Sequence, residues 1–147
     1  MAVKLQKAAL DAGIVTIDGE RAAHFYGEVL GLPLAGEVRL PDIGLIRRYA
    51  AGDSTLRVFV PDTRPQRESS RDGMASQTGI RYLTLTISNL DETVAAVTAA
   101  GYKVPVAIRD LRPGVRVAQV EDADGNAIEL MEYTSASLQL RRPVPGV

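Results

Sequence analysis

The sequence predicts an α+β fold in which one βαβββ module occurs twice within a single domain. The predicted order of elements is a strand, a helix and three strands, followed by the same order again. The halves keep a nearly constant offset, because Tyr82 lies 71 residues after Asp11 and Glu129 lies 72 after Arg57. A length of 147 residues suits one domain. We expect each helix to cover one sheet face, and the opposite faces to line a shared cup-shaped, concave surface.

Residues 11–17 alternate in polarity and predict the first strand, and a helix is predicted over 18–31. Asp18 suits the N-cap, and Gly31 stands where a left-handed residue ends a helix. Apolar residues at i, i+3, i+4 and i+7 form the stripe that this helix should bury: Ala22, Phe25, Tyr26 and Val29.

The second half repeats the pattern with a strand over 81–87 and a helix between Asn89 and Gly101. Asn89 followed by Glu92 resembles a capping box. The buried stripe of this helix is predicted to be Leu90, Val94 and Val97.

Six further strands complete the two modules, at about 34–40, 43–50, 54–60, 103–108, 114–121 and 126–133. We expect the first module over about 9–62, a linker loop over 63–78, the second module over about 79–134 and a tail over 135–147. The arginines of the loop are expected to be solvated, with a lid over an anionic ligand as the alternative: Arg64, Arg67 and Arg71.

The composition excludes several classes of function. Seventeen basic and eighteen acidic residues leave a net charge of −1, which argues against a nucleic-acid binder. The chain has no cysteine, so thiolate metal sites and thiol nucleophiles are absent. No apolar run suits a membrane helix and no signal-peptide pattern is visible, so we expect a cytoplasmic protein. Fourteen of the seventeen basic residues are Arg.

Two segments resemble the vicinal oxygen chelate superfamily, which contains glyoxalases, bleomycin-resistance proteins and extradiol dioxygenases. They are the helix end His24–Leu32, similar to "FY…vLGl", and Glu121–Leu130, similar to "DPdGn.iEl". The resemblance covers about residues 9–134 and implies two βαβββ modules that form a cup, commonly in a homodimer. It also implies a small-molecule ligand, because members include lyases, epimerases, fosfomycin-type resistance enzymes and metal-free antibiotic-binding proteins.

Metal-using members place ligands at four strand positions, which fall here on Asp11, Arg57, Tyr82 and Glu129. Glu129 matches the family pattern and the other three depart from it. A guanidinium has no acceptor and does not deprotonate, so Arg57 cannot be a ligand. Phenolate ligation by Tyr82 is costly. We therefore expect no metal cofactor, and the alternative is a divalent cation held by the two carboxylates.

Strand alternation predicts that these four side chains face the cup. A buried salt bridge with no further role is one interpretation of the four. The functional interpretation makes Arg57 a binding residue for a ligand oxygen, with Asp11 or Glu129, if desolvated, transferring a proton. Tyr82 would donate a hydrogen bond to the same oxygen.

Phe59, Met131 and Tyr133 are expected to form an apolar wall of the site, with core filling as the alternative. His24, the single histidine, is expected on the surface or at a subunit contact. Arg47 and Arg48 must face opposite ways on their strand, and the sequence leaves open which of them enters the site.

The sequence thus predicts a small-molecule-binding protein that acts as a metal-independent isomerase, cyclase or lyase on an oxygenated, aromatic or anionic metabolite. Two alternatives stay open: a non-catalytic protein that sequesters an antibiotic, and a metal-dependent glyoxalase- or dioxygenase-like enzyme. A homodimer is expected, without nucleic-acid or membrane partners.

Overall fold

The computed structural model describes residues 1–134, which divide into two compact units, one over Met1–Glu68 and one that begins at Ser69. The boundary between the units falls within the loop predicted over 63–78. The predicted tail, 135–147, lies outside the described residues. The assignment of both modules to one domain stays a prediction.

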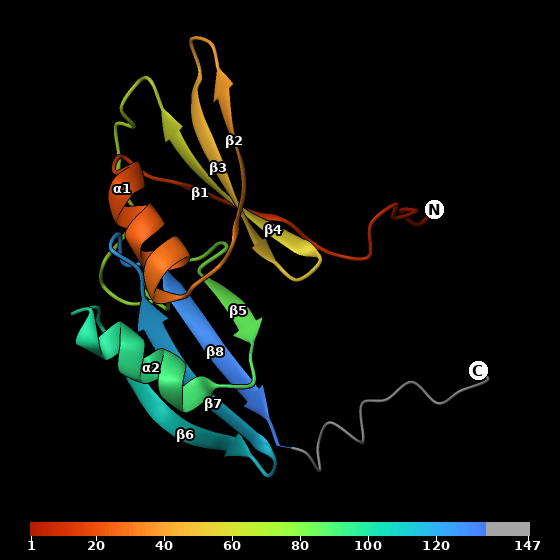
Figure 1. Cartoon of the computed structure of the whole chain (residues 1–147), viewed down its shortest axis with the longest axis vertical. Helices are drawn as coiled ribbons and strands as arrows, with labels where there is room; N and C mark the ends of the chain where they lie inside the picture. The colour runs from red at the N-terminus through yellow and green to blue at the C-terminus, as the bar shows by residue number, and fades with distance from the viewer. Residues whose placement is uncertain (135–147) are drawn as a thin grey trace. The chain divides into compact units, whose positions relative to one another are not determined.

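The first unit is a four-stranded mixed sheet with one helical segment (Figure 1). The strand order is β1-β4-β3-β2, and β1 pairs in parallel with β4 while the other pairs are antiparallel. The elements are β1 (Ala12–Val15), α1 (Gly19–Ala22), the π-helical segment η1 (Ala23–Val29), β2 (Leu34–Leu40), β3 (Gly44–Ala51) and β4 (Ser54–Pro61).

The second unit repeats this topology, with strand order β5-β8-β7-β6 and a parallel pairing of β5 with β8. The prediction of an α+β fold made of two βαβββ modules is confirmed. Strand β6 (Val106–Arg112) begins and ends later than the strand predicted over 103–108. The elements are β5 (Tyr82–Thr86), α2 (Leu90–Ala99), β6 (Val106–Arg112), β7 (Val115–Glu121) and β8 (Ala127–Tyr133).

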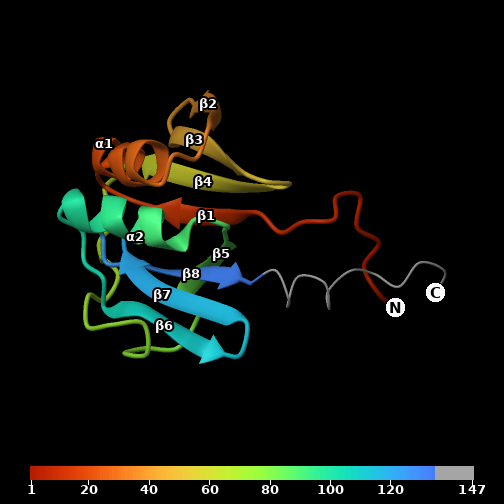
Figure 2. The ribbon, with the colours of Figure 1, turned by 60° about the horizontal axis from the view of Figure 1, so that its bottom comes forward.

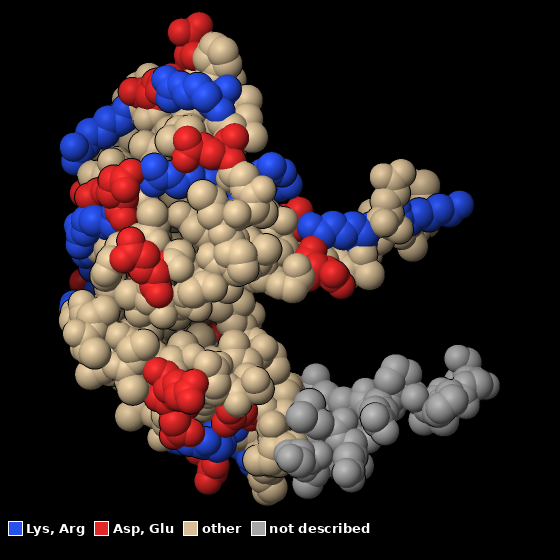
Figure 3. All heavy atoms as spheres, in the orientation of Figure 1, with Lys and Arg blue, Asp and Glu red and all other residues tan. Residues whose placement is uncertain are grey.

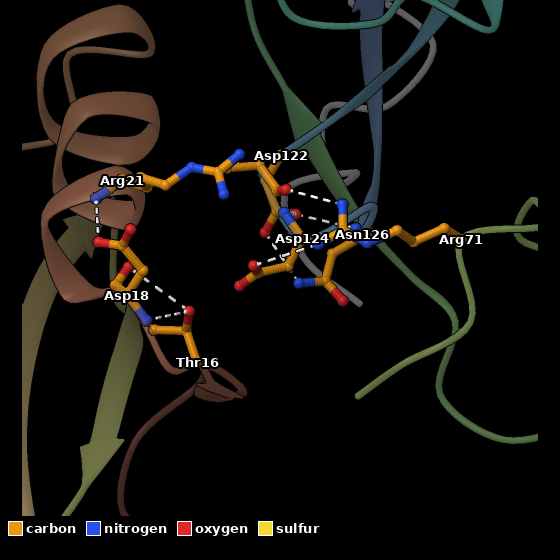
Figure 4. A network of polar contacts seen from close by, with 8 residues as sticks. Thr16, Asp18, Arg21, Arg71, Asp122, Asp124 and Asn126 are labelled. Atoms are coloured by element: carbon orange, nitrogen blue, oxygen red, sulfur yellow. Dashed lines mark hydrogen bonds and ion pairs between the residues drawn. The ribbon is translucent and has the colours of Figure 1, made fainter. Parts of the chain in front are cut away.

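The first helical segment is irregular. Asp18 caps it as predicted, since its Oδ1 accepts a hydrogen bond from the Arg21 backbone N–H at 3.1 Å (Figure 4). After Ala22 the helix widens, because Leu30 N–H donates to the Phe25 carbonyl five residues back at 2.9 Å. The wide turn accompanies two consecutive buried aromatic residues, Phe25 and Tyr26, whose rings pack edge to face.

Helix α2 buries Leu90 and Val97 of its predicted stripe completely. Its predicted capping box is wrong in detail. Asn89 is the N-cap residue, but its side chain makes no hydrogen bond to a backbone N–H and donates to Glu92 Oε2 at 3.4 Å instead.

In each unit the helix lies against one face of its own sheet (Figure 2). Arg47 of β3 identifies the covered face of the first sheet, because its guanidinium donates to the Gly19 carbonyl of α1 at 3.1 Å. It also forms ion pairs with Glu20 at 2.7 Å and Glu37 at 2.9 Å. Leu56 and Val58 of β4 are buried on this side. The opposite face of each sheet is the one expected to carry the site.

Candidate functional site

The predicted alternation along β4 is confirmed. Leu56 and Val58 are buried, whereas the side chain of Arg57 is 50% exposed and Phe59 is half-buried. Strand β1 runs alongside with Gly13 paired to Arg57. Arg57 and Phe59 therefore lie on the sheet face opposite the helix, where the sequence places them.

Asp11, just before β1, connects this face to the N-terminal segment. Its Oδ1 accepts hydrogen bonds from Lys7 Nζ at 2.6 Å and from the Thr55 backbone N–H at 2.7 Å. Its Oδ2 lies 3.3 Å from Arg57 Nη2. These contacts, the bond from Lys7 first and that from Thr55 second, lower the pKa of the Asp11 carboxyl.

The lowered pKa of Asp11 is opposite to the shift that a desolvated acid would show. A carboxyl with a raised pKa was the condition for Asp11 to transfer a proton, and Asp11 does not meet that condition. Its contacts are those of an ionised carboxylate that holds Lys7 and Arg57 in place. The buried salt bridge of the alternative interpretation is not found either, because half of the Arg57 side chain is exposed.

The second unit carries the other predicted site residues on the face opposite α2. Glu129 of β8 pairs in register with Thr84 of β5, and the Thr84 hydroxyl donates to Glu129 Oε1 at 3.0 Å. Tyr82 precedes Thr84 by two residues, so it points the same way, and it is 51% exposed. Met131 and Tyr133 follow Glu129 on this face and are half-buried.

A surface hollow of about 370 Å³ begins at Tyr82 within the second unit. The segment before β5 forms most of its lining, and one nitrogen of the Arg81 guanidinium is buried without a hydrogen-bond partner among residues 1–134. The lining residues are Met74, Ala75, Gly79, Ile80, Arg81 and Tyr82.

The residues at the family's four ligand positions do not fit a divalent metal. Arg57 offers no lone pair, and the Asp11 oxygens already accept from two cations and a backbone N–H. Glu129 has a hydroxyl partner, and within either unit's described residues no three His, Asp or Glu side chains form a metal-binding group. The chemistry of these side chains therefore does not support a metal-dependent step.

The register of β3 decides between the two neighbouring arginines. Arg48 pairs with Arg57, whereas Arg47 pairs with Val58 and contacts α1. Arg48 is thus the one on the face of Arg57, a residue that the sequence alone could not select. His24 lies on the surface as expected, with its side chain 47% exposed and its Nε2 3.9 Å from Glu28.

The loop between β7 and β8 has an internal order that the sequence indicates only as a hairpin signal. Asp122 Oδ1 accepts from the backbone N–H groups of Asp124 and Asn126, and Oδ2 accepts from the Asn126 amide (Figure 4). Arg71 contacts this loop through the Ala123 carbonyl at 2.9 Å and Asp124 at 3.8 Å. Arg71 is therefore anchored in the second unit and is not simply solvated.

Charged side chains of both signs are interspersed over the visible surface (Figure 3), in line with the net charge of −1. In residues 1–134, neither helix has the length and hydropathy that a membrane span requires.

The sequence model of the Glyoxalase/Bleomycin resistance protein/Dioxygenase superfamily matches residues 8–130. The chain belongs to this superfamily. The match spans both βαβββ modules and confirms the resemblance to the vicinal oxygen chelate fold. No curated protein sequence matches the chain significantly.

Solved structures with the superfamily fold resemble the chain over most of its length. A glyoxalase family protein from Bacillus cereus has a TM-score of 0.78 and 20% identity, covering 90% of this chain and 97% of its own. The antibiotic-binding protein TnmS3 from Streptomyces sp. CB03234 has a TM-score of 0.64 and 23% identity, covering 91% of this chain and 99% of its own. The fosfomycin resistance protein FosX from Mesorhizobium loti has a TM-score of 0.61 and 15% identity, covering 93% of this chain and 100% of its own. At these identities the likeness shows the fold.

Proposed function

We propose that this superfamily member binds a small oxygenated molecule with an acidic oxygen, that Arg57 receives this oxygen, and that no metal ion takes part. The observation that carries the proposal is the state of Arg57. Its side chain is half exposed and contacts Asp11 at 3.3 Å through one nitrogen, while Lys7 and Thr55 lie closer to the other oxygen of that carboxylate. Most of its donors remain available for a ligand oxygen.

We assign the proton-transfer step of a metal-independent isomerase, cyclase or lyase to Glu129. Asp11 is held ionised by its partners, so it is a poor proton donor at neutral pH. Glu129 is half-buried, and it shares its sheet face with the exposed Tyr82, whose hydroxyl can donate a hydrogen bond. That the faces of both units act on one ligand is implied by the family resemblance and stays a prediction.

Sequestration of a drug-like compound is the second candidate. The half-buried Phe59, Met131 and Tyr133 suit contact with an aromatic ligand, and TnmS3, which shares the fold, is an antibiotic-binding protein. A sequestering protein needs apolar walls and polar anchors, but it does not need Glu129 as a base.

Binding is tested by calorimetric titration with benzoate as an aromatic monoanion. We expect Arg57→Gln to weaken benzoate binding about tenfold, because a charge-assisted hydrogen bond is lost. Arg39→Gln is the matched control: Arg39 lies in the same sheet but pairs with Asp62 at 2.8 Å, and it should bind as the parent does. Equal affinities of the parent and Arg57→Gln would refute the role of Arg57.

Catalysis is tested by incubating the protein with a metabolite extract and analysing bound and released compounds by mass spectrometry. An enzyme of the proposed type releases a rearranged or cleaved product, and Glu129→Gln retains the unaltered compound. If the parent and Glu129→Gln both return the same compound unchanged, the protein is a sequestering protein and the proton-transfer role of Glu129 is wrong.

A further inference from the structure

We infer that Arg48 joins Arg57 in a single binding site for a doubly charged anionic group of the ligand. The inference rests on the proposed function, in which Arg57 is the single arginine that binds the acidic oxygen of the ligand. It adds a second binding residue and specifies the charge of the ligand.

The sheet register brings the two arginines together. Arg48 of β3 and Arg57 of β4 are direct partners in an antiparallel pair, so both side chains leave the same face. The β-carbons of such partners lie about 4.5–5.5 Å apart. The Arg48 guanidinium lies toward Gly36 of β2, so we infer that it turns toward Arg57 when both side chains bind one anion.

The charges on this face are unbalanced. Like charges that are directly opposite each other in a sheet destabilise it unless neighbouring charges of opposite sign offset them. Arg47, on the other face, has two such carboxylates, from Glu20 and Glu37. Arg48 is exposed, and within the first unit, which is described in full, no carboxylate forms an ion pair with it.

Asp11 does not restore the balance. It is the one acidic residue aligned with this face in the described first unit, and its single negative charge faces both Lys7 and Arg57. Three cations and one carboxylate leave two positive charges. A ligand group with two negative charges would neutralise them.

The structure also provides an apolar neighbourhood for such a ligand. Gly36 of β2 pairs with Arg48 on the side away from β4, and a β-carbon at Gly36 would lie 2.6 Å from Arg48 Nη2. The guanidinium therefore lies over the bare backbone of Gly36. Ile46 and Phe59, which are paired in register next to the arginines, can contact the body of an organic anion.

Two kinds of ligand carry this charge: a phosphate monoester, and a compound with two neighbouring carboxylates. Guanidinium groups bind both through paired hydrogen bonds. The test compares three compounds that share one aromatic ring and differ in charge, namely benzoate, phthalate and phenyl phosphate, by calorimetric titration at pH 7.5 and constant ionic strength.

We expect at least one of the two dianions to bind the parent protein about tenfold more tightly than benzoate. The tighter of the two identifies the group. Arg48→Gln should weaken the binding of the dianion more than that of benzoate, so that the preference for the dianion is lost, and Arg48→Lys should keep part of this preference. Arg39→Gln should behave as the parent does, which excludes a general effect of net charge.

The inference is overturned if both dianions bind no better than benzoate, or if Arg48→Gln changes dianion affinity no more than Arg39→Gln does. In that case Arg57→Gln can still weaken benzoate binding, which leaves the proposed function intact. Failure of Arg57→Gln to weaken any of the three compounds instead refutes the proposed function itself.

Discussion

Asp11 holds Arg57 through one carboxylate oxygen at 3.3 Å, and its other oxygen accepts shorter hydrogen bonds from Lys7 and the Thr55 backbone. The carboxylate therefore makes closer contacts with Lys7 and the Thr55 backbone than with Arg57. This relationship leaves Arg57 oriented but chemically available, and it gives Asp11 a positioning role.

The first prediction concerns pH. Because Asp11 has a lowered pKa in the folded state, it stabilises the fold above its unfolded value, 3.8, and this contribution is lost as the pH falls through the folded value. We expect Asp11→Asn to be less stable than the parent at neutral pH, with the difference shrinking as the pH falls below 3.8. Urea unfolding from neutral to acid pH measures it. A difference independent of pH would mean that the charge of Asp11 is not the cause.

The second prediction contrasts two glycines of the first sheet. Gly44 has φ +153°, and a β-carbon there would overlap the Val60 carbonyl oxygen and the Phe59 ring. We expect Gly44→Ala to cost about 3 kcal/mol or more in the free energy of unfolding. Gly13 has no atom within 4 Å of such a carbon, so Gly13→Ala should be neutral or gain about 0.5 kcal/mol. Chemical denaturation compares them, and equal effects would contradict the register of β3 and β4.

The third prediction concerns the loop after β7. Asp122 is 8% exposed and accepts three hydrogen bonds within the loop. Asp122→Ala should lower the free energy of unfolding by about 2 kcal/mol, because it leaves three partly buried donors of the loop without their acceptor. Asp122→Asn keeps one acceptor oxygen and should cost less. Thermal denaturation gives both values, and an Ala variant as stable as the parent would show that water replaces the carboxylate.

The fourth prediction concerns metals. The family resemblance implies that Arg57 stands at a metal-ligand position, and Asp11 is held by cations, so we expect EDTA treatment to change neither the melting temperature nor benzoate affinity. Elemental analysis of undialysed protein should give less than stoichiometric metal. Stoichiometric zinc, manganese or iron, with binding lost on chelation and restored by the same ion, would contradict the metal-free proposal.

Residue patterns predicted the parts of the fold that depend on local chemistry. The alternation in β4 correctly separated Arg57 from the buried Val58, and Asp18 and Gly31 correctly marked the ends of the first helix. These features follow from side-chain polarity and backbone freedom at single positions. Sequence alone is sufficient for them.

Features that depend on pairing between distant segments were not predictable. The choice between Arg47 and Arg48 is made by the register of β3 against β4, which no local pattern encodes. The widened helix at Phe25 and the later start of β6 have no signal in the residues themselves. The contacts of Asp11 with Lys7 and the Thr55 backbone were also missed, because Lys7 lies before the predicted strand.

The parallel pairing of the first and last strand in each unit has a consequence for the order of folding. Ala12 pairs with Leu56, 44 positions later, and Tyr82 pairs with Ala127, 45 positions later. Loop closure over such separations is slow compared with the formation of a hairpin. During synthesis on the ribosome, β1 therefore has no partner until β4 has emerged, and each module acquires its complete sheet only when its final strand arrives.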